Sequence, residues 1–136
     1  MKKIQLPLND KIINSLRAGD EVLLSGTVYV ARDQAHKRMV DQIEKIRNSE
    51  FGILDVGQSL PIPLPNATLY YCGPTPTPSG KIVGSCGPTT SKRMDEFTPT
   101  LLKQGLKGMI GKGNRSPEVV QAIKKYRAVY FIAVGG

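Results

Sequence analysis

The residues best suited to chemistry lie in residues 84–94, GSCGPTTSKRM. Thr89, Thr90 and Ser91 supply hydroxyl groups, and Arg93 supplies a planar guanidinium that can bind a carboxylate through two parallel hydrogen bonds. The stretch follows an expected strand and reaches a point where a helix could begin, and the unpaired N–H groups at a helix start attract carboxylate or phosphate. The pattern indicates a small-anion site. The alternative stays open that Thr90 or Ser91 only caps a helix and that Arg93 is solvated.

Two further cations follow expected strands. Lys112 lies between two glycines after the KGMI segment, and Arg32 lies between an apolar segment and the helix expected from Asp33. Ligands of α/β sheets bind beyond the carboxyl ends of the strands, where both side chains would lie. The phosphate-loop pattern GxxxxGK[ST] is absent, so an ordinary basic loop at Lys112 is the alternative. Arg32, Arg93 and Lys112 together fit a ligand with two carboxylates better than a single phosphate.

The histidine and the cysteines offer little support for other chemistries. His36 is the only histidine and follows Ala35 of an apolar helical stripe, which favours a surface or supporting role over catalysis. The sequence supports neither a Ser/His/Asp triad nor a cluster of metal ligands. Cys72 and Cys86 lack CxxC spacing and are interpreted as free thiols carried by strands.

These residues require strands and helices to position them, and the sequence predicts an α/β domain. Apolar residues recur with helical spacing over 33–48, which is the clearest helix, and helices are also expected at 98–105 and 117–126. Strands are expected at 20–31, 67–72, 81–85, 107–110 and 128–134. Alternation after residue 67 predicts parallel pairing there, whereas the earlier half is expected to be more antiparallel. The continuous apolar run 128–134 predicts a strand buried on both faces.

Length and charge limit the class of protein. The 136 residues form a single domain, 1–136, with a formal net charge of +8. That charge suits an anionic ligand, and a basic nucleic-acid binder remains the weaker alternative because the basic residues are scattered and no RNA- or DNA-binding motif is present. No apolar run reaches the roughly 20 residues of a membrane span, and the start lacks a signal-peptide pattern. We therefore expect a cytoplasmic protein that binds neither membrane nor nucleic acid.

Five segments together resemble one known family. They are ARDQAHKR at 31–38, YYCGPTP at 70–76, GSCGPTTSKRMDEFTPTLL at 84–102, KGMIGKG at 107–113 and AVYFIAVGG at 128–136. In this order they resemble the β subunit, or C-terminal domain, of the class I fumarate hydratase and L(+)-tartrate dehydratase family. The resemblance implies a swivelling β/β/α domain, with mixed sheet layers and flanking helices. It also implies a further helix and strand after the final VGG.

The resemblance also implies a function. Family members are iron–sulfur hydro-lyases that add or remove water across a C4 dicarboxylic acid, either fumarate/malate or tartrate/oxaloacetate. The implied [4Fe–4S] cluster belongs to a partner α subunit and is not ligated by this chain, so activity would require an α subunit, with an α₂β₂ assembly expected. Arg32, Thr89, Arg93 and Lys112 are the implied substrate-binding residues, with Thr89 and Lys112 also catalytic and no metal ligand in this chain. A non-catalytic anion-binding or protein-interaction module descended from that subunit is the alternative.

Overall fold

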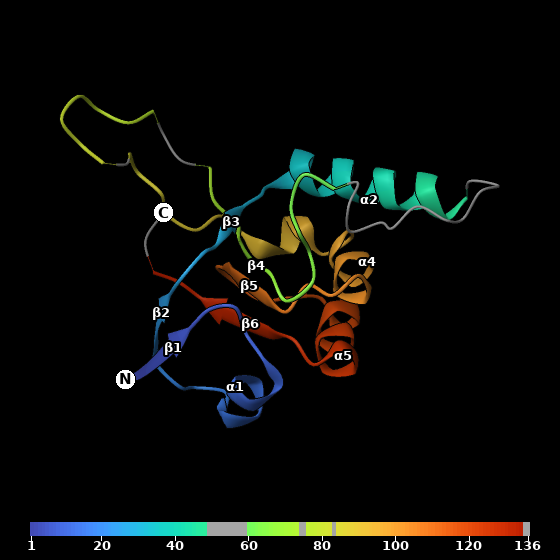
Figure 1. Cartoon of the computed structure of the whole chain (residues 1–136), viewed down its shortest axis with the longest axis horizontal. Helices are drawn as coiled ribbons and strands as arrows, with labels where there is room; N and C mark the ends of the chain where they lie inside the picture. Colours follow the sequence, from blue (N-terminus) through green and yellow to red (C-terminus); the bar gives the residue numbers. More distant parts are fainter. Residues whose placement is uncertain (49–59, 74–75, 83, 135–136) are drawn as a thin grey trace.

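The computed structural model describes residues 1–48, 60–73, 76–82 and 84–134 (Figure 1). Its elements are β1 (Lys2–Gln5), α1 (Asp10–Ser15), β2 (Val22–Ser25), β3 (Tyr29–Val30), α2 (Asp33–Arg47), β4 (Thr68–Tyr70), the 3₁₀ helix η1 (Ser91–Met94), α4 (Thr98–Lys103), β5 (Gly108–Gly111), α5 (Pro117–Tyr126) and β6 (Val129–Ile132). The α/β class expected from the sequence is confirmed.

The strands form a four-stranded sheet in the order β3-β4-β5-β6 and a two-stranded sheet of β1 and β2. Every ladder between these named strands is parallel, so the expectation of antiparallel pairing in the earlier half is wrong. The reason lies in the connections: α1 lies between β1 and β2, and α2 lies between β3 and β4. A chain that crosses back through a helix enters the next strand in the same direction, whereas a hairpin would reverse it.

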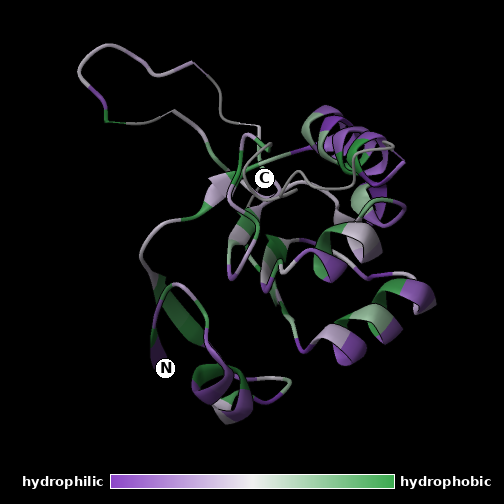
Figure 2. Cartoon of the chain, turned by 45° about the vertical axis from the view of Figure 1, so that its right-hand side comes forward, coloured by the Kyte–Doolittle hydropathy of each residue, from purple (hydrophilic) through white to green (hydrophobic). Residues whose placement is uncertain are grey.

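The molecule is layered around the four-stranded sheet. Helices α2, α4 and α5 pack on one face and bury the main core with alternate side chains of the strands, including Leu69, Tyr71 and Met109. The small sheet and α1 pack against the other face of β6, where Val129 and Phe131 contact a second cluster. Figure 2 shows hydrophobic residues along the strands and hydrophilic residues on the outward sides of the helices.

Two strand expectations need correction. The run 128–134 does contact apolar clusters on both faces, but β6 is the edge strand, and its residues are half-buried except Ile132, which is 66% exposed. The expected strand 81–85 is not formed by Lys81, Ile82, Gly84 or Ser85, and residue 83 lies outside the described residues.

The helix starts follow local chemistry. Ser116 accepts a hydrogen bond from Val119 N–H and Pro117 occupies the first turn, as the sequence predicts for α5. Asn9 caps α1, and its side chain accepts a hydrogen bond from Ile12 N–H. No helix in the described part of the chain combines the length and the apolar character needed to cross a membrane.

Candidate functional site

The carboxyl ends of β3, β4 and β5 place the expected site residues along one edge of the sheet. Arg32 follows β3 by two residues, Gly73 follows β4 by three, and Lys112 follows β5 directly. Because the strands are parallel and adjacent, these three ends open on the same edge. The segment containing Thr89 is hydrogen-bonded between the ends of β4 and β5.

Backbone hydrogen bonds fix Thr89 beside Lys112. Thr89 N–H donates to Tyr71 O at 2.7 Å, Lys112 N–H donates to Thr89 O at 3.2 Å, and Ser91 N–H donates to Lys112 O at 2.9 Å. Isolated bridges also join Cys72 to Pro88 in the antiparallel sense and Thr90 to Lys112 in the parallel sense. The GPTTS segment is therefore held at the carboxyl ends of β4 and β5.

Arg32 lies against the backbone of Gly73. A Cβ placed on Gly73 would come 2.3 Å from Arg32 Cζ, a distance that real Cβ atoms do not tolerate. The glycine therefore leaves room for the guanidinium at the end of β4. The sequence analysis did not predict this role. The only signal was the position of Gly73 directly after the expected strand 67–72.

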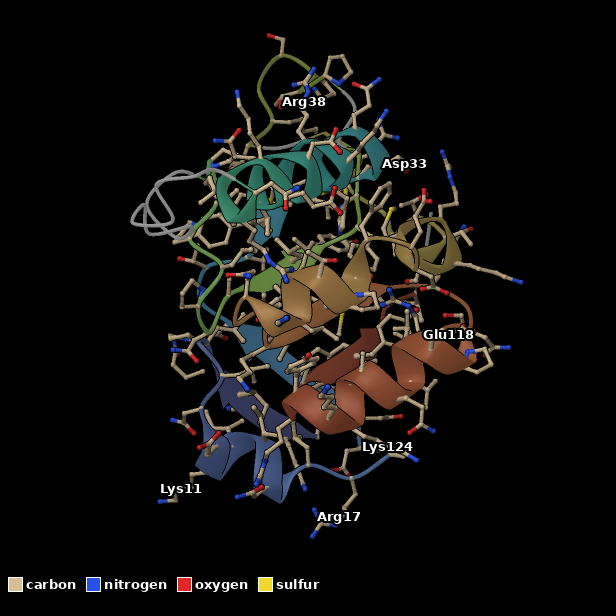
Figure 3. The ribbon with its side chains drawn as sticks, turned by 90° about the vertical axis from the view of Figure 1, so that its right-hand side faces the viewer. Lys11, Arg17, Asp33, Arg38, Glu118 and Lys124 are labelled. Atoms are coloured by element: carbon tan, nitrogen blue, oxygen red, sulfur yellow. The ribbon has the colours of Figure 1, made fainter. Side chains whose placement is uncertain are left out.

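Arg93 pairs with Asp33, the residue after Arg32. Its Nε and Nη2 lie 3.1 Å and 2.9 Å from the same oxygen, Asp33 Oδ2. Figure 3 shows Asp33 at the start of α2, beside the 3₁₀ turn that carries Arg93. Both side chains are exposed, 59% and 41%, so the pair contributes only about 0–1 kcal/mol and an anionic ligand could compete with Asp33.

The other expected side chains are less engaged. Lys112 and Thr89 are half-buried, and Arg32 is exposed. Within residues 1–48, 60–73, 76–82 and 84–134, no side-chain hydrogen bond or ion pair involves Arg32, Thr89 or Lys112. Two cations and one hydroxyl are thus without a protein partner there, which is the state that an incoming anion requires.

The neighbouring hydroxyls and the helix start do not behave as expected. Ser91 is fully buried, and its Oγ lies 2.6 Å from Tyr130 Oη, so it supports the fold and does not face a ligand. Thr90 precedes η1 but makes no side-chain capping bond, and η1 spans only four residues. The alternative that these hydroxyls only cap a helix is therefore wrong, whereas anion binding at the start of this short helix stays a prediction.

Arg115 is a buried side chain that contacts residues of several elements near the site. Its side chain is 2% exposed, and Nε donates to Asp95 Oδ1 at 2.7 Å. The guanidinium also donates to Thr98 Oγ1 at 2.9 Å and to Tyr71 Oη at 3.2 Å. Burial raises the pKa of the Tyr71 phenol, so Tyr71 stays neutral beside Arg115. In the sequence Arg115 ends the basic segment KGMIGKGNR, and no residue pattern there distinguishes a buried arginine from an exposed one.

His36 is wholly buried, so the expectation of a surface histidine is wrong, while its expected supporting role agrees with its contacts. Its Nδ1–H donates to Arg32 O at 2.9 Å, and the ring lies between Tyr71 and Phe97. Burial lowers the pKa of His36 below 6.5, opposed mainly by this hydrogen bond. The ring is therefore neutral near pH 7 and supports the backbone that carries Arg32.

The described residues do not form a site that could hold an iron–sulfur cluster. No group of three or more His, Cys, Asp or Glu side chains within them is arranged to bind a metal ion. Cys72 and Cys86 lie together, with 2.7 Å between their sulfurs, and no third thiol exists in the sequence. Two sulfurs this close act on each other rather than as a cluster's three-cysteine ligand set.

Comparison with known protein families gives a match over the whole chain. A family model described as "Fumarase C-terminus" matches residues 1–136, the whole chain. The chain belongs to the fumarase C-terminus family. This confirms the family resemblance that the five motifs indicate.

Named relatives of the fumarase C-terminus family give the same indication. An aerobic class I fumarate hydratase of Salmonella typhimurium is 38% identical over 114 residues, covering 83% of this chain and 18% of the relative. "Fumarate hydratase 2" of Leishmania major is 37% identical over 119 residues, covering 87% and 19%.

A relative in Methanocaldococcus jannaschii, provisionally named L(+)-tartrate dehydratase subunit beta, is 30% identical over 132 residues, covering 95% of this chain and 62% of the relative. The chain thus spans about a fifth of the length of the two fumarate hydratases and less than two thirds of the tartrate dehydratase subunit.

Proposed function

We propose that this chain supplies the carboxylate-binding part of a hydro-lyase site that reversibly hydrates or dehydrates a C4 dicarboxylic acid. One observation carries the proposal: Arg32 and Lys112 follow the carboxyl ends of β3 and β5, Thr89 is hydrogen-bonded between the ends of β4 and β5, and within the described residues no side-chain hydrogen bond or ion pair involves any of the three. The relatives named as fumarate hydratases and as a tartrate dehydratase subunit support a diacid as the substrate class.

In this proposal the two arginines bind the substrate carboxylates. Arg32 precedes α2 and lies over Gly73 at the end of β4. Arg93 lies on η1 and pairs with Asp33, the residue after Arg32, so the two guanidinium groups lie near the same end of the sheet. A carboxylate that binds Arg93 replaces or joins Asp33 on the same N–H groups. Charge-assisted bonds of this kind are stronger than neutral ones and fix orientation as well as affinity.

Lys112 and Thr89 serve the reacting end. When a proton leaves the carbon beside a carboxylate, negative charge builds on that carboxylate, and the Lys112 ammonium stabilises it electrostatically. The Thr89 hydroxyl binds the substrate and takes part in the proton transfer at that carbon. Their backbones are joined by hydrogen bonds, so the two side chains project from neighbouring backbone segments.

The remaining machinery is proposed to come from a second chain. A [4Fe–4S] cluster carried by an α subunit would supply a Lewis acid for the substrate hydroxyl. The described residues of this chain do not fit such a cluster. We propose a cytoplasmic α₂β₂ assembly in which this chain acts as a swivelling β/β/α domain that completes the site on the α subunit.

Reconstitution tests the proposal. The chain is mixed anaerobically with an α chain that carries the family's cluster cysteines, and fumarate absorbance is followed with malate as substrate, with tartrate assayed in parallel. We expect turnover of at least one diacid from the mixture and none from either chain alone. Absence of turnover with malate, fumarate and tartrate would contradict the catalytic role. Diacid binding without turnover would favour the non-catalytic anion-binding alternative.

A further inference from the structure

We propose that Cys72 and Cys86 form a redox-active dithiol that hydrogen peroxide converts into an intramolecular disulfide. The two residues are 14 positions apart in the sequence, yet their sulfurs lie 2.7 Å from each other. Both cysteines are free thiols in this structure. The inference does not rest on the proposed hydro-lyase function, because it concerns only the reactivity of these two side chains.

The backbone holds the two sulfurs together. Tyr70 and Cys72 alternate with Tyr71 along the end of β4, so they lie on the face opposite the main core. Tyr70 Oη donates to Cys86 O at 2.6 Å, and Cys72 pairs with Pro88 in an isolated antiparallel bridge. The segment is therefore held to the end of β4 at Cys86 itself and again two residues later, at Pro88. A disulfide needs about 2.05 Å between sulfurs, so side-chain rotation over a fraction of an ångström closes the bond.

The two thiols differ in ways that suit sequential oxidation. Cys72 is 1% exposed, and burial followed by its contact with Cys86 raises the pKa of its thiol to about 11, while Arg32 opposes the shift. Cys72 is therefore protonated and shielded at neutral pH. Cys86 is half-buried and is the thiol that a small oxidant reaches first.

The chemistry balances with one peroxide molecule. The Cys86 thiolate attacks a peroxide oxygen, the O–O bond breaks, and hydroxide leaves and takes up a proton as water, giving a sulfenic acid on Cys86. The Cys72 sulfur then attacks the Cys86 sulfur, the S–O bond breaks, and the second oxygen leaves as water with the Cys72 proton. Two thiols and one hydrogen peroxide thus yield one disulfide and two waters.

Mass spectrometry of the whole chain tests this reaction. The reduced protein is treated with hydrogen peroxide, remaining thiols are alkylated, and intact mass and peptide maps are recorded. We expect a mass loss of two hydrogen atoms, no alkylation at either cysteine, a cross-linked peptide pair containing Cys72 and Cys86, and full reversal by dithiothreitol. Alkylation of both cysteines after peroxide, addition of oxygen without a cross-link, or a disulfide between two chains would each overturn the proposal.

Single variants assign the roles of the two sulfurs. In Cys72→Ser the Cys86 sulfenic acid has no resolving thiol, and a cyclic 1,3-dione should label it. In Cys86→Ser the buried Cys72 should stay reduced under the same treatment. Equal reactivity of Cys72 in that variant, with a native circular dichroism spectrum, would contradict the order of steps. The wild-type peptide map decides the disulfide itself even where a variant fails to fold.

Discussion

The guanidinium of Arg32 fills the space that a side chain at position 73 would need. Gly73 has no left-handed backbone conformation, so Gly73→Ala introduces a methyl group without backbone strain. The methyl group must displace Arg32, and displacement of a positioning group by about 1 Å can cost about 100-fold in rate. We expect kcat/KM for the diacid to fall by about that factor in the reconstituted enzyme, with the thermal midpoint of unfolding nearly unchanged.

A double-mutant cycle isolates the cause of that loss. If Gly73→Ala acts through Arg32, the variant that combines it with Arg32→Ala should be no slower than Arg32→Ala alone. Additive losses would mean that Gly73 serves another contact.

Arg93 offers a second test at the level of one side chain. Arg93→Ala should lower kcat/KM for the diacid by about 10²–10³, because a donor aimed at developing charge is lost. The fold should survive, since the side chain is 59% exposed. Arg93→Lys should recover only part of the activity because an ammonium cannot form the planar two-point contact. The control is Lys92→Ala, which removes an exposed neighbouring charge and should leave kinetics unchanged.

The sequence predicted the positions of the cations relative to the strands, but it did not predict their contacts. Arg32 and Lys112 closely follow their strands as expected, because the carboxyl ends of parallel strands lie together at one end of the sheet. The partner of Arg93 was not predictable, because Asp33 is 60 positions away and the contact depends on how α2 docks near η1. Ser91 was misjudged for the same reason: Tyr130 comes from the far edge strand.

At the scale of elements, His36 fixes the start of α2 to the core and makes its stability depend on pH. Burial lowers the pKa of His36 in the folded protein below its ordinary value of 6.5. The unfolded chain therefore binds more protons at acidic pH, so this contribution to stability is complete above pH 6.5 and is lost as the pH falls below it. We expect the free energy of unfolding to decrease by up to about 1.4 kcal/mol between about pH 7.5 and 5.5, measured by urea denaturation.

The matched variant for that measurement is His36→Asn. Asparagine can keep the hydrogen bond to Arg32 O but cannot take up a proton. Its unfolding free energy should change less over the same pH range. A pH dependence equal to that of the wild type would show that other groups cause it.

Arg115 joins α4, β4 and the start of α5 through Asp95, Thr98 and Tyr71. Asp95 also accepts a bond from Ser116 N–H at 2.7 Å, so the pair anchors the cap of α5. Arg115→Ala leaves Asp95 buried without its cation, and we expect a loss of about 3–5 kcal/mol in the free energy of unfolding by urea. Arg93→Ala, which breaks the exposed pair with Asp33, should cost at most about 1 kcal/mol in the same assay. Equal losses would contradict the structural role of Arg115.

The elements themselves were largely predictable, while their pairing was not. Helices α2 and α5 carry clear apolar spacing, and Ser116 with Pro117 marks a helix start in the sequence. Strand direction in the earlier half depended on which strands pair across α1 and α2, and the presence of these helices in the sequence does not by itself say which strands become neighbours. The edge position of β6 follows from sheet order, which apolar content alone does not encode.

At the scale of the whole molecule, the formal charge of +8 should assist capture of a dianion. We expect KM for the diacid to rise as ionic strength increases from about 0.05 to about 0.3 M. At these salt concentrations the attraction between exposed charges fades beyond a screening length of about 10 Å. The salt dependence should be weaker in Lys112→Met. The salt dependence should persist in Lys124→Met, because Lys124 lies on α5, apart from the start of α2 where Asp33 and the proposed site lie (Figure 3). Equal loss in both variants would assign the effect to overall charge.

The hydrogen bonds between Thr89 and Lys112 join backbone groups and not side chains. Every residue type has these backbone groups, except that proline lacks the N–H donor. Point substitutions at 89 or 112 can therefore exchange the functional group presented to a ligand while preserving the spacing from which it is presented. Only a proline at 89, 91 or 112 would remove one of these hydrogen bonds, because proline has no N–H group to donate.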